Sequence, residues 1–401
     1  MKMSAKAAAR LDHAGALRLR IISRHNADIF NKNLILWLAR KVSPALEMVP
    51  SFCFGWADNG ASPAESPAMV MGYRRARLLM EHGAGYLKPV LGAQAWGVAK
   101  VSLTQDRSLI IRSKDIHLIN YLAHIFKCVE ETTRGALKLE RVADDALRLV
   151  NGRSAGGFSG RDLAELFFAL EENFLPFPQW VVERIGRQKE FWGPTIFEQA
   201  VDSPLINGPF GRATWEIRVI NQQPGSKIYQ TSYAKIGASD YVGNICAGGD
   251  ALKSLAAVCL AYQELFPAWT ADKALEMARL FLAEAYDYAR QIQEQLAFGF
   301  AAARKEFCPD YPFAAPRPLD FSTDFMGGIK GDRLVPYVID INFYYGATGL
   351  QKTDPRAFAQ MSRRSAKITQ KFVRDVLALA DGRPAEAASR TSGLLPPVLI
   401  A

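Results

Sequence analysis

One stretch near the C-terminal end, residues 323–342, restricts the possible folds most because it indicates two strands joined by a tight polar turn. Its second half alternates apolar and polar residues with the period of a β-strand, which places Asp340 and Asn342 on one face. Asp324 lies on the antiparallel partner strand, alongside this pair. Two carboxylates and an amide oxygen are ligands that Mg²⁺ takes from proteins. The hairpin therefore predicts a magnesium site. The alternative is an edge hairpin whose polar residues lie in water.

Length and charge indicate the scale of the molecule and the kind of partner. The 401 residues suffice for two or three domains of about 150 residues each. The formal charge of +9 favours an anionic partner such as a nucleotide, a nucleic acid or an acidic peptide. No run of five like charges occurs, so we expect an anionic ligand in a cleft and no nucleic acid.

Cysteine usage and hydropathy bear on the compartment. The five cysteines are odd in number and include no Cys-x-x-Cys, which argues against a disulfide framework or a zinc site and favours a reduced, cytoplasmic setting. No apolar run approaches the roughly 18 to 20 residues of a membrane helix. Residues 1–10 are basic and alanine-rich but lack an apolar core, so we interpret them as a helix and not as a signal peptide, with a transit peptide as the alternative.

A second informative stretch, residues 86–101, predicts another hairpin. Its first strand carries Lys88, Gly92 and Gly97 bracket the turn, and the second strand runs from Val98 to Leu103. Glycines let backbone N–H groups approach an anion, and a lysine adds a point charge, so this hairpin can fold over phosphates. The alternative is an ordinary glycine-rich hairpin.

Helical patterns and a glycine-rich segment surround these strands. We expect a helix over 69–82 that ends at Gly83 and Gly85, an amphipathic helix over 161–171, and a closing helix over 354–379. The glycine-rich segment 151–160 has no Gly-Lys-Ser/Thr ending and is interpreted as a mobile connection. The Pro-rich stretch 308–318 and the segment 381–401 predict a covering loop and a tail.

The middle of the chain predicts further strands and a helical block. Residues 180–185 indicate a buried strand that carries Glu183, and residues 212–219 indicate a strand with Glu216 and Arg218 on one face. Ser232–Lys235 continues the sheet. After a polar turn that contains Asn244, Asp250 is expected to cap a helical block over 251–302.

The order of these predicted strands, turns and helices, with the motifs that they carry, resembles the ATP-grasp superfamily, and within it the endospore coat-associated group. The resemblance spans roughly residues 30–350 and rests on Asn31-Lys32, Leu87-Lys88-Pro89, Glu216-Ile217-Arg218, Asn244 with Gly248-Gly249, and Asp340-Ile341-Asn342. It implies an α+β fold in which two lobes with antiparallel sheets clasp ATP. The implied parts are a reduced N-terminal region (1–84), an N-terminal lobe (85–179), a C-terminal lobe (180–355) and a closing helix with a tail (356–401).

The resemblance also implies roles for individual residues. Lys88 would span the adenine and the α-phosphate, with Lys32 as a second lysine, while Gly92 to Gly97 would close over the phosphates. Glu183 would belong to the adenine hinge. Arg218 and Asn244 would act at the triphosphate and at the reacting phosphate. Asp324, Asp340 and Asn342 would hold Mg²⁺, or Mn²⁺ in its place.

The activity that the resemblance implies is the ATP-dependent ligation of a small carboxylate or peptide to an amine, or to a thiol, through an acylphosphate. A kinase with a hydroxyl acceptor and a non-catalytic nucleotide-binding scaffold are the alternatives. Phosphoryl transfer needs chiefly positioning and charge neutralisation, so no protein nucleophile or general base has to be identified.

Overall fold

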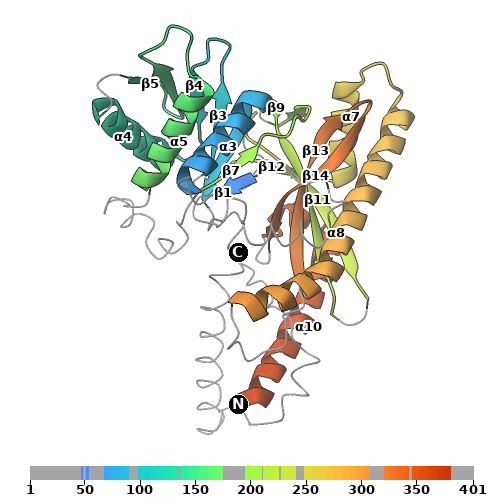
Figure 1. The fold of residues 1–401 in the computed structure, drawn as a ribbon. Coiled ribbons are helices and arrows are strands. Elements are labelled where there is room, and N and C mark those ends of the chain that lie inside the picture. Colours follow the sequence, from blue (N-terminus) through green and yellow to red (C-terminus); the bar gives the residue numbers. More distant parts are fainter. Residues whose placement is uncertain are drawn as a thin grey trace. The chain divides into compact units, whose positions relative to one another are not determined.

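The computed structural model describes residues 47, 51–53, 67–89, 98–132, 136–174, 195–209, 211–224, 227–240, 248–307, 320–342 and 346–380 (Figure 1). The chain divides into two compact units. Unit 1 comprises Met1–Met48, Ser203–Ala238 and Gly249–Ala401, and unit 2 comprises Val49–Asp202 and Ser239–Gly248. Each unit combines helices with an antiparallel sheet, which confirms the α+β class.

Unit 2 is built on a seven-stranded sheet in the order β1-β7-β2-β3-β4-β6-β5. Its strands are β1 (Ser51–Cys53), β2 (Ala84–Pro89), β3 (Ala99–Leu103), β4 (Leu109–Arg112), β5 (Leu137–Ala143), β6 (Ala146–Asn151) and β7 (Thr195–Gln199). Its helices are α3 (Pro67–His82), α4 (Ile116–Thr132) and α5 (Gly160–Phe174). The predicted hairpin around Lys88 is confirmed as β2 and β3, and α3, which we had grouped with the N-terminal region, packs on α5 of this unit.

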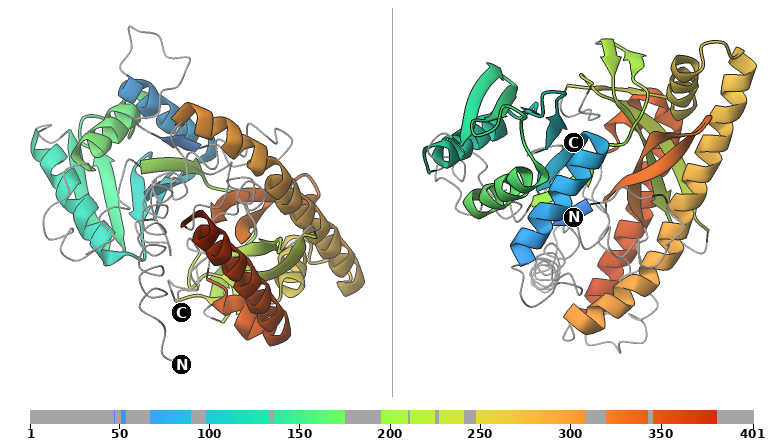
Figure 2. Two further views of the ribbon diagram at one scale, coloured as in Figure 1. Left: turned by 90° about the horizontal axis from the view of Figure 1, so that it is seen from below. Right: turned by 45° about the horizontal axis from the view of Figure 1, so that its top comes forward.

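The two faces of this sheet differ in character because its strands alternate. Apolar residues such as Leu87, Val101, Ile111 and Phe197 face one way and form a buried core with the helices, which lie together on one side of the sheet (Figure 2). The charged residues Lys88, Glu198, Lys100 and Arg112 lie on the opposite face. Helices cover one face of the sheet in unit 2, so its charged groups gather on the other.

Local signals explain where the helices begin and end. Asp115 Oδ1 accepts from the N–H groups of His117 and Leu118 at 3.0 and 3.2 Å and so caps α4. Gly83, with a φ of 72°, ends α3 as expected. Gly85 is not part of that stop, because it lies inside β2, where a Cβ would come within 2.3 Å of the Phe197 ring.

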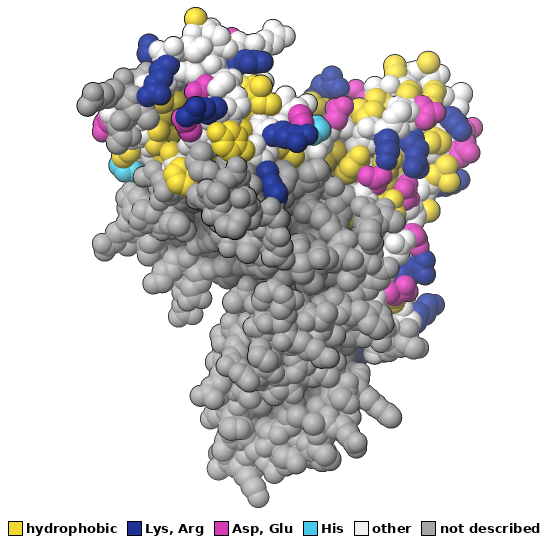
Figure 3. All heavy atoms as spheres, viewed as in Figure 1, with side chains coloured by type: hydrophobic (Ala, Val, Ile, Leu, Met, Phe, Trp, Pro, Cys, Tyr) yellow, Lys and Arg dark blue, Asp and Glu magenta, His cyan; other side chains and the backbone are white. Residues whose placement is uncertain are grey.

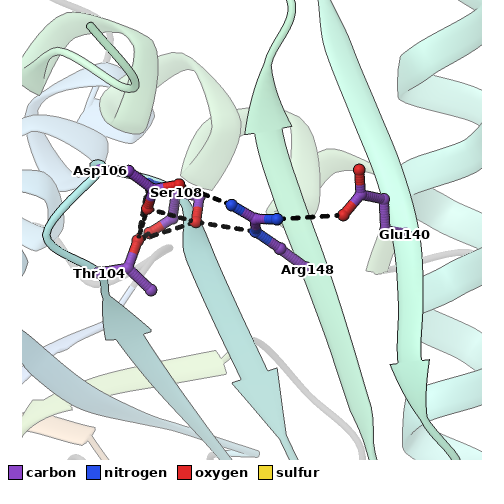
Figure 4. A network of polar contacts seen from close by, with 5 residues as sticks. All are labelled: Thr104, Asp106, Ser108, Glu140 and Arg148. Carbon is purple, nitrogen blue, oxygen red and sulfur yellow. Dashed lines mark hydrogen bonds and ion pairs between the residues drawn. The ribbon is translucent and has the colours of Figure 1, made fainter.

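The glycine-rich segment 151–160 is a connection between β6 and α5, as predicted. Gly157 has a φ of 77°, and a Cβ there would meet Arg107 Cβ at 2.4 Å, so this glycine permits close contact with the β3–β4 turn. The turn is held by polar contacts: Asp106 accepts hydrogen bonds from Thr104 and Ser108 and pairs with Arg148, which also pairs with Glu140 (Figure 4). Gly157 therefore serves packing, whereas a Cβ at Gly160 would meet no atom within 4 Å.

Unit 1 is built on a five-stranded sheet in the order β12-β11-β10-β13-β14. Its strands are β10 (Trp215–Gln222), β11 (Tyr229–Ile236), β12 (Asp250–Leu252), β13 (Asp320–Lys330) and β14 (Arg333–Asn342), and a separate hairpin is formed by β8 (Ile206–Gly208) and β9 (Gly211–Ala213). The helices are α7 (Ser254–Leu265), α8 (Ala271–Phe307), α9 (Thr348–Thr353) and α10 (Pro355–Ala380). The hairpin predicted over 323–342 and the closing helix are confirmed.

Helices contact both faces of this sheet, but at different places (Figure 2). The long helix α8 lies on one face, where Asn221 donates to the carbonyl of Ala289 at 2.7 Å and Phe281 contacts Trp215. The next residue of β10, Gln222, points to the other face and donates to Ser365 of α10 at 2.8 Å. Residues of β10 that share the phase of Gln222 therefore lie on the face opposite α8.

Two predicted elements differ from the structure. Residues 212–219 are not one strand, because β9 pairs back on β8 and β10 begins only after Thr214, whose carbonyl accepts from Gly237. The helical block does not begin at 251, and Asp250 is not its cap: Asp250 opens β12, which pairs with β11, and α7 starts at Ser254. Pairing with a distant strand overrides the local helical pattern here.

Some expectations lie outside the described residues: the helix over 1–10, the strand with Glu183, the loop 308–318 and the tail 381–401. Among the helices that the structure describes, none combines the length and the apolar character needed to span a membrane. On the face shown in Figure 3, the Lys and Arg side chains of the described residues are interspersed with Asp and Glu.

Candidate functional site

The face of the unit 1 sheet opposite α8 brings together four of the predicted residues. Arg218 on β10 lies directly opposite Asp324 on β13, and Asp324 lies opposite Asp340 on β14. Asn342 follows on the same face and donates from Nδ2 to Asp324 Oδ2 at 3.2 Å. A register shift between Asp324 and Phe325 bulges β14 at Ile339 and keeps these side chains in phase.

Asp324 is the centre of this arrangement. Its side chain is 3 % exposed, and it accepts two parallel hydrogen bonds from Arg218, from Nε to Oδ1 and from Nη2 to Oδ2, both at 2.7 Å. Lys235 Nζ on β11 donates to Oδ2 at 2.9 Å. A bidentate guanidinium and an ammonium on one buried carboxylate form a strong, directional contact. Both carboxylate oxygens are therefore already engaged by cations.

Glu216 completes a cluster that is balanced in charge. It lies opposite Lys235 in the β10–β11 register and forms an ion pair with it. The four residues Glu216, Arg218, Lys235 and Asp324 thus contribute two positive and two negative groups, which we call the buried charge cluster. Burying ions is tolerable only when they are paired in this way, because each unpaired ion loses several kcal/mol of hydration.

Burial and the neighbouring charges act together on these groups. Burial by itself would raise the pKa of Asp324, but Arg218 and Lys235 outweigh it and hold that pKa well below its ordinary value. Burial and Arg218 act to lower the pKa of Lys235, yet the carboxylates of Asp324 and Glu216 prevail and raise it. Burial raises the pKa of Glu216 above its ordinary value, with Lys235 opposing. Asp324 and Lys235 are consequently charged at neutral pH.

A loop carbonyl borders the cluster. The carbonyl of Gly346, just beyond the hairpin, accepts from Arg218 Nη1 at 3.2 Å and from the hydroxyl of Tyr233 at 2.8 Å. Tyr233 lies opposite Arg218 in the sheet and is 1 % exposed. The guanidinium of Arg218 is thus held by Asp324 on one side and by the Gly346 carbonyl on the other.

The residues predicted to bind metal supply the right donors, but one of them is occupied. Asp324, Asp340 and Asn342 offer two carboxylates and an amide oxygen, which suit Mg²⁺. Among the described residues, no group of three or more His, Cys, Asp and Glu is placed to hold a metal ion. Asp324 could join this donor set only if Arg218 and Lys235 released it.

A second buried ion pair lies in unit 2. Lys88 pairs with Glu198 of the neighbouring strand β7, and their side chains are 15 % and 4 % exposed. Lys88 Nζ also lies 5.9 Å from the centre of the Tyr86 ring. Glu198 Oε1 is buried and has no hydrogen-bond partner among the residues that the structure describes. An unsatisfied buried carboxylate oxygen is costly, so it marks a position where a donor from a ligand would be favoured.

Five of the predicted site residues lie outside the described part of the chain: Lys32, Gly92, Gly97, Glu183 and Asn244. Two residues of the charge pairs were missed by the sequence reasoning. Lys235 stands between Ala234 and Ile236 in β11, and Glu198 follows Ile196 and Phe197 in β7. A lone charge beside apolar neighbours in a strand was the available signal.

Comparison with solved structures finds distant likenesses only at the level of the fold. No family model and no curated protein matches the sequence. Among solved structures, the crystal structure of D-cycloserine synthetase DcsG is similar, with 12 % identity over 89 % of this chain and 71 % of that one and a TM-score of 0.34. What this chain does is therefore argued from its own residues.

Proposed function

We propose that the chain is an ATP- and Mg²⁺-dependent ligase of the ATP-grasp type, nearest to the endospore coat-associated group. It would activate a small carboxylate or peptide as an acylphosphate and pass it to an amine, releasing ADP and phosphate. The resemblance of the ordered motifs motivates this proposal. The observation that carries it is the buried charge cluster beside Asp340 and Asn342.

The cluster suits phosphate binding because its cations are held by exchangeable partners. Arg218 and Lys235 converge on Asp324 Oδ2 at 2.7 and 2.9 Å, so two positive groups lie next to one another on one face of the sheet. A nucleotide phosphate offers the same kind of oxygen acceptors as the carboxylate and more negative charge. We propose that the phosphates take over Arg218 and Lys235 and thereby free Asp324.

The freed carboxylate would then serve the metal. Asp324, Asp340 and Asn342 would hold Mg²⁺, which when bound neutralises charge on the phosphates. Arg218 and Lys235 would orient the transferred phosphoryl group and stabilise the charge that spreads over its oxygens. The carboxylate of the substrate supplies the attacking oxygen, and the amine then displaces phosphate from the acylphosphate. Asn244, for which we keep the predicted role near the reacting phosphate, lies outside the described residues.

The resemblance also assigns nucleotide-binding residues to unit 2. Lys88 supplies the charge that the resemblance assigns to the adenine and α-phosphate, and the buried, unpartnered Glu198 Oε1 is an acceptor for an exocyclic amine such as that of adenine. For the compartment, we keep the cytoplasmic setting that cysteine usage in the sequence favours.

The proposal is tested by following ADP and the products together. The protein is incubated with ATP, Mg²⁺ and a mixture of amino acids and short acidic peptides, with hydroxylamine added in a parallel sample to capture an acylphosphate as a hydroxamate. Mass spectrometry should find a condensed product, and hydroxamate in the parallel sample, with ADP release that depends on a carboxylate. A phosphorylated hydroxyl compound would instead identify a kinase. Tight Mg-ATP binding without any turnover would identify a scaffold protein.

A further inference from the structure

The outer face of α10 carries positive side chains that the proposed function does not use. Met361 and Ser365 are buried and lie on the inner face of this helix. Arg356, Arg363 and Lys367 are exposed. Their spacings of seven and four residues correspond to about two turns and one turn of helix, so the three side chains lie in one row, which we call the basic stripe.

The cations of the basic stripe are not neutralised within the part of the chain that the structure describes. The side chains of Arg356, Arg363 and Lys367 form neither a hydrogen bond nor an ion pair there. Arg363 and Lys367 are one turn apart, and like charges at this spacing repel each other and destabilise a helix. Between positions 355 and 374 the sequence contains no Asp or Glu. An anionic partner would therefore relieve a repulsion that the free protein retains.

The helix α10 also holds a large share of the net charge. Its 26 residues include six Lys and Arg and one acidic residue, Asp375, so it supplies five of the nine formal positive charges. In the sequence, Lys371 and Arg374 follow Lys367 at spacings of four and three residues, which continue the helical period. A search for consecutive like charges misses this arrangement, because the period of the helix separates its members.

Two further cations lie beside the basic stripe, at the start of β11. The guanidinium of Arg364 lies 4.8 Å from the centre of the Tyr229 ring, and Lys227 Nζ lies 5.3 Å from the same centre. The described side chains of α10 include no exposed large apolar residue. Helices that bind a lipid bilayer insert such residues, so this surface is suited to a charged partner in water and not to a membrane.

The basic stripe lies on the side of the unit 1 sheet that carries the buried charge cluster. Gln222 has the same phase as Arg218 on β10, about 13 Å further along the strand, and donates to α10. The chain also runs from Gly346, whose carbonyl accepts from Arg218, through α9 into α10 (Figure 1). An extended substrate that reacts at the cluster can therefore reach the stripe.

We propose that the basic stripe docks an acidic peptide, the substrate whose carboxylate the ligase activates. Alternate side chains of an extended peptide are about 7 Å apart, close to the rise of about 6 Å between Arg363 and Lys367. Arginine binds carboxylates through two parallel hydrogen bonds. The choice of a peptide over nucleic acid rests on the proposed function, because nucleic acid has no carboxylate to activate.

The test measures binding of a fluorescein-labelled octaglutamate peptide by fluorescence anisotropy, without ATP. Arg363→Gln/Lys367→Gln is compared with Lys273→Gln/Arg279→Gln, which removes two exposed charges from α8 on the other face of the sheet. The stripe variant should bind octaglutamate at least about fivefold more weakly than the wild type, and the α8 variant within about twofold of it. Binding should weaken as sodium chloride is added, because the charges are exposed.

Two controls identify the partner and the fold. Labelled octaglutamine should not bind, and an oligothymidylate of the same charge should bind more weakly than octaglutamate. Without ligand the stripe variant should melt at or above the wild type, because repulsion is relieved. Equal binding of octaglutamate by all variants, tighter and stripe-dependent binding of oligothymidylate, binding of phosphatidylserine vesicles in place of octaglutamate, or a destabilised stripe variant would each overturn the proposal.

The same proteins separate failure of this proposal from failure of the proposed function. Stripe-dependent binding of octaglutamate without ADP release would support the docking surface and contradict the ligase. Product formation from ATP without octaglutamate binding would overturn the docking surface and leave the ligase in place. If octaglutamate is turned over, the stripe variant should raise KM and leave kcat near the wild-type value, because docking contacts are equal in the bound substrate and in the transition state.

Discussion

Replacing Asp324 by Asn tests the buried charge cluster most directly. The substitution keeps the size of the side chain but turns one carboxylate oxygen into an NH₂ group that faces the donors of Arg218 or Lys235. The cluster then holds two cations and one anion, Glu216, and Asp324 is only 2 % exposed, so water cannot compensate. Removing one partner of a buried ion pair costs about 3–5 kcal/mol. A unit of this size would lose roughly 6–20 °C in melting temperature.

Urea unfolding measures this loss, with Asp332→Asn as the control. Asp332 is exposed in the turn of the same hairpin, and its substitution should change the free energy of unfolding by no more than about 0.5 kcal/mol. The double variant Arg218→Met/Asp324→Asn restores the charge balance and leaves the Lys235–Glu216 pair in place. It should be more stable than Asp324→Asn alone, which is the signature of coupled charges.

The pH dependence of the free energy of unfolding tests the role of Asp324 independently. Because the folded-state pKa of Asp324 is lowered, its stabilising contribution is complete above the unfolded-state value of about 4 and disappears as the pH falls through the folded-state value. The stability difference between wild type and Asp324→Asn should therefore be constant between about pH 6 and 8 and shrink below about pH 4. A loss below about 1 kcal/mol at neutral pH, or a double variant no better than the single one, would refute the reasoning.

Three further predictions concern the proposed activity. Asp340→Asn should lower turnover at least about a hundredfold, on the order of 3 kcal/mol, and leave the melting curve of the ligand-free protein near that of the wild type; a destabilised but fully active protein would remove Asp340 from the metal site. Lys88→Met combined with Glu198→Gln removes both charges of a buried pair, so the fold should persist while calorimetry finds weaker ATP binding; an unchanged dissociation constant would exclude Lys88 from the site. Mn²⁺ followed by electron paramagnetic resonance should bind at least about tenfold more tightly with ADP present, because Arg218 and Lys235 hold Asp324 without it; equal affinity in both states would contradict the exchange of partners.

Several elements could be predicted from the sequence because their causes are local. The period-two alternation around Asp340 and the tight turn define the hairpin 320–342 within the chain itself. Asp354 and Pro355 form the start of α10 in the same local manner, with Ala357 N–H donating to Asp354 Oδ1 at 2.9 Å. The place of Glu216 and Arg218 on one face likewise follows from strand alternation alone.

Other features were decided only by contacts between distant segments. By its local sequence Asp250 is a typical helix cap, but in the structure it belongs to β12, which pairs with β11. Gly157 is likewise typical of a flexible link, but in the structure Arg107 packs against it. The same holds for Glu198, whose partner Lys88 is 110 residues away. Local propensity has no access to such partners.

The buried charge cluster shows both contributions together. The sequence by itself determined that Asp340 and Asn342 share a face, because they alternate along one strand, whereas the bulge of β14 at Ile339 brings Asp324 onto that face. Only the tertiary structure decided that Asp324 is bound by Arg218, which lies 106 residues earlier, and by Lys235 from a third strand. Strand order and register between remote segments follow from the burial of the whole sheet against α8, and it is this global packing that determines which charges meet.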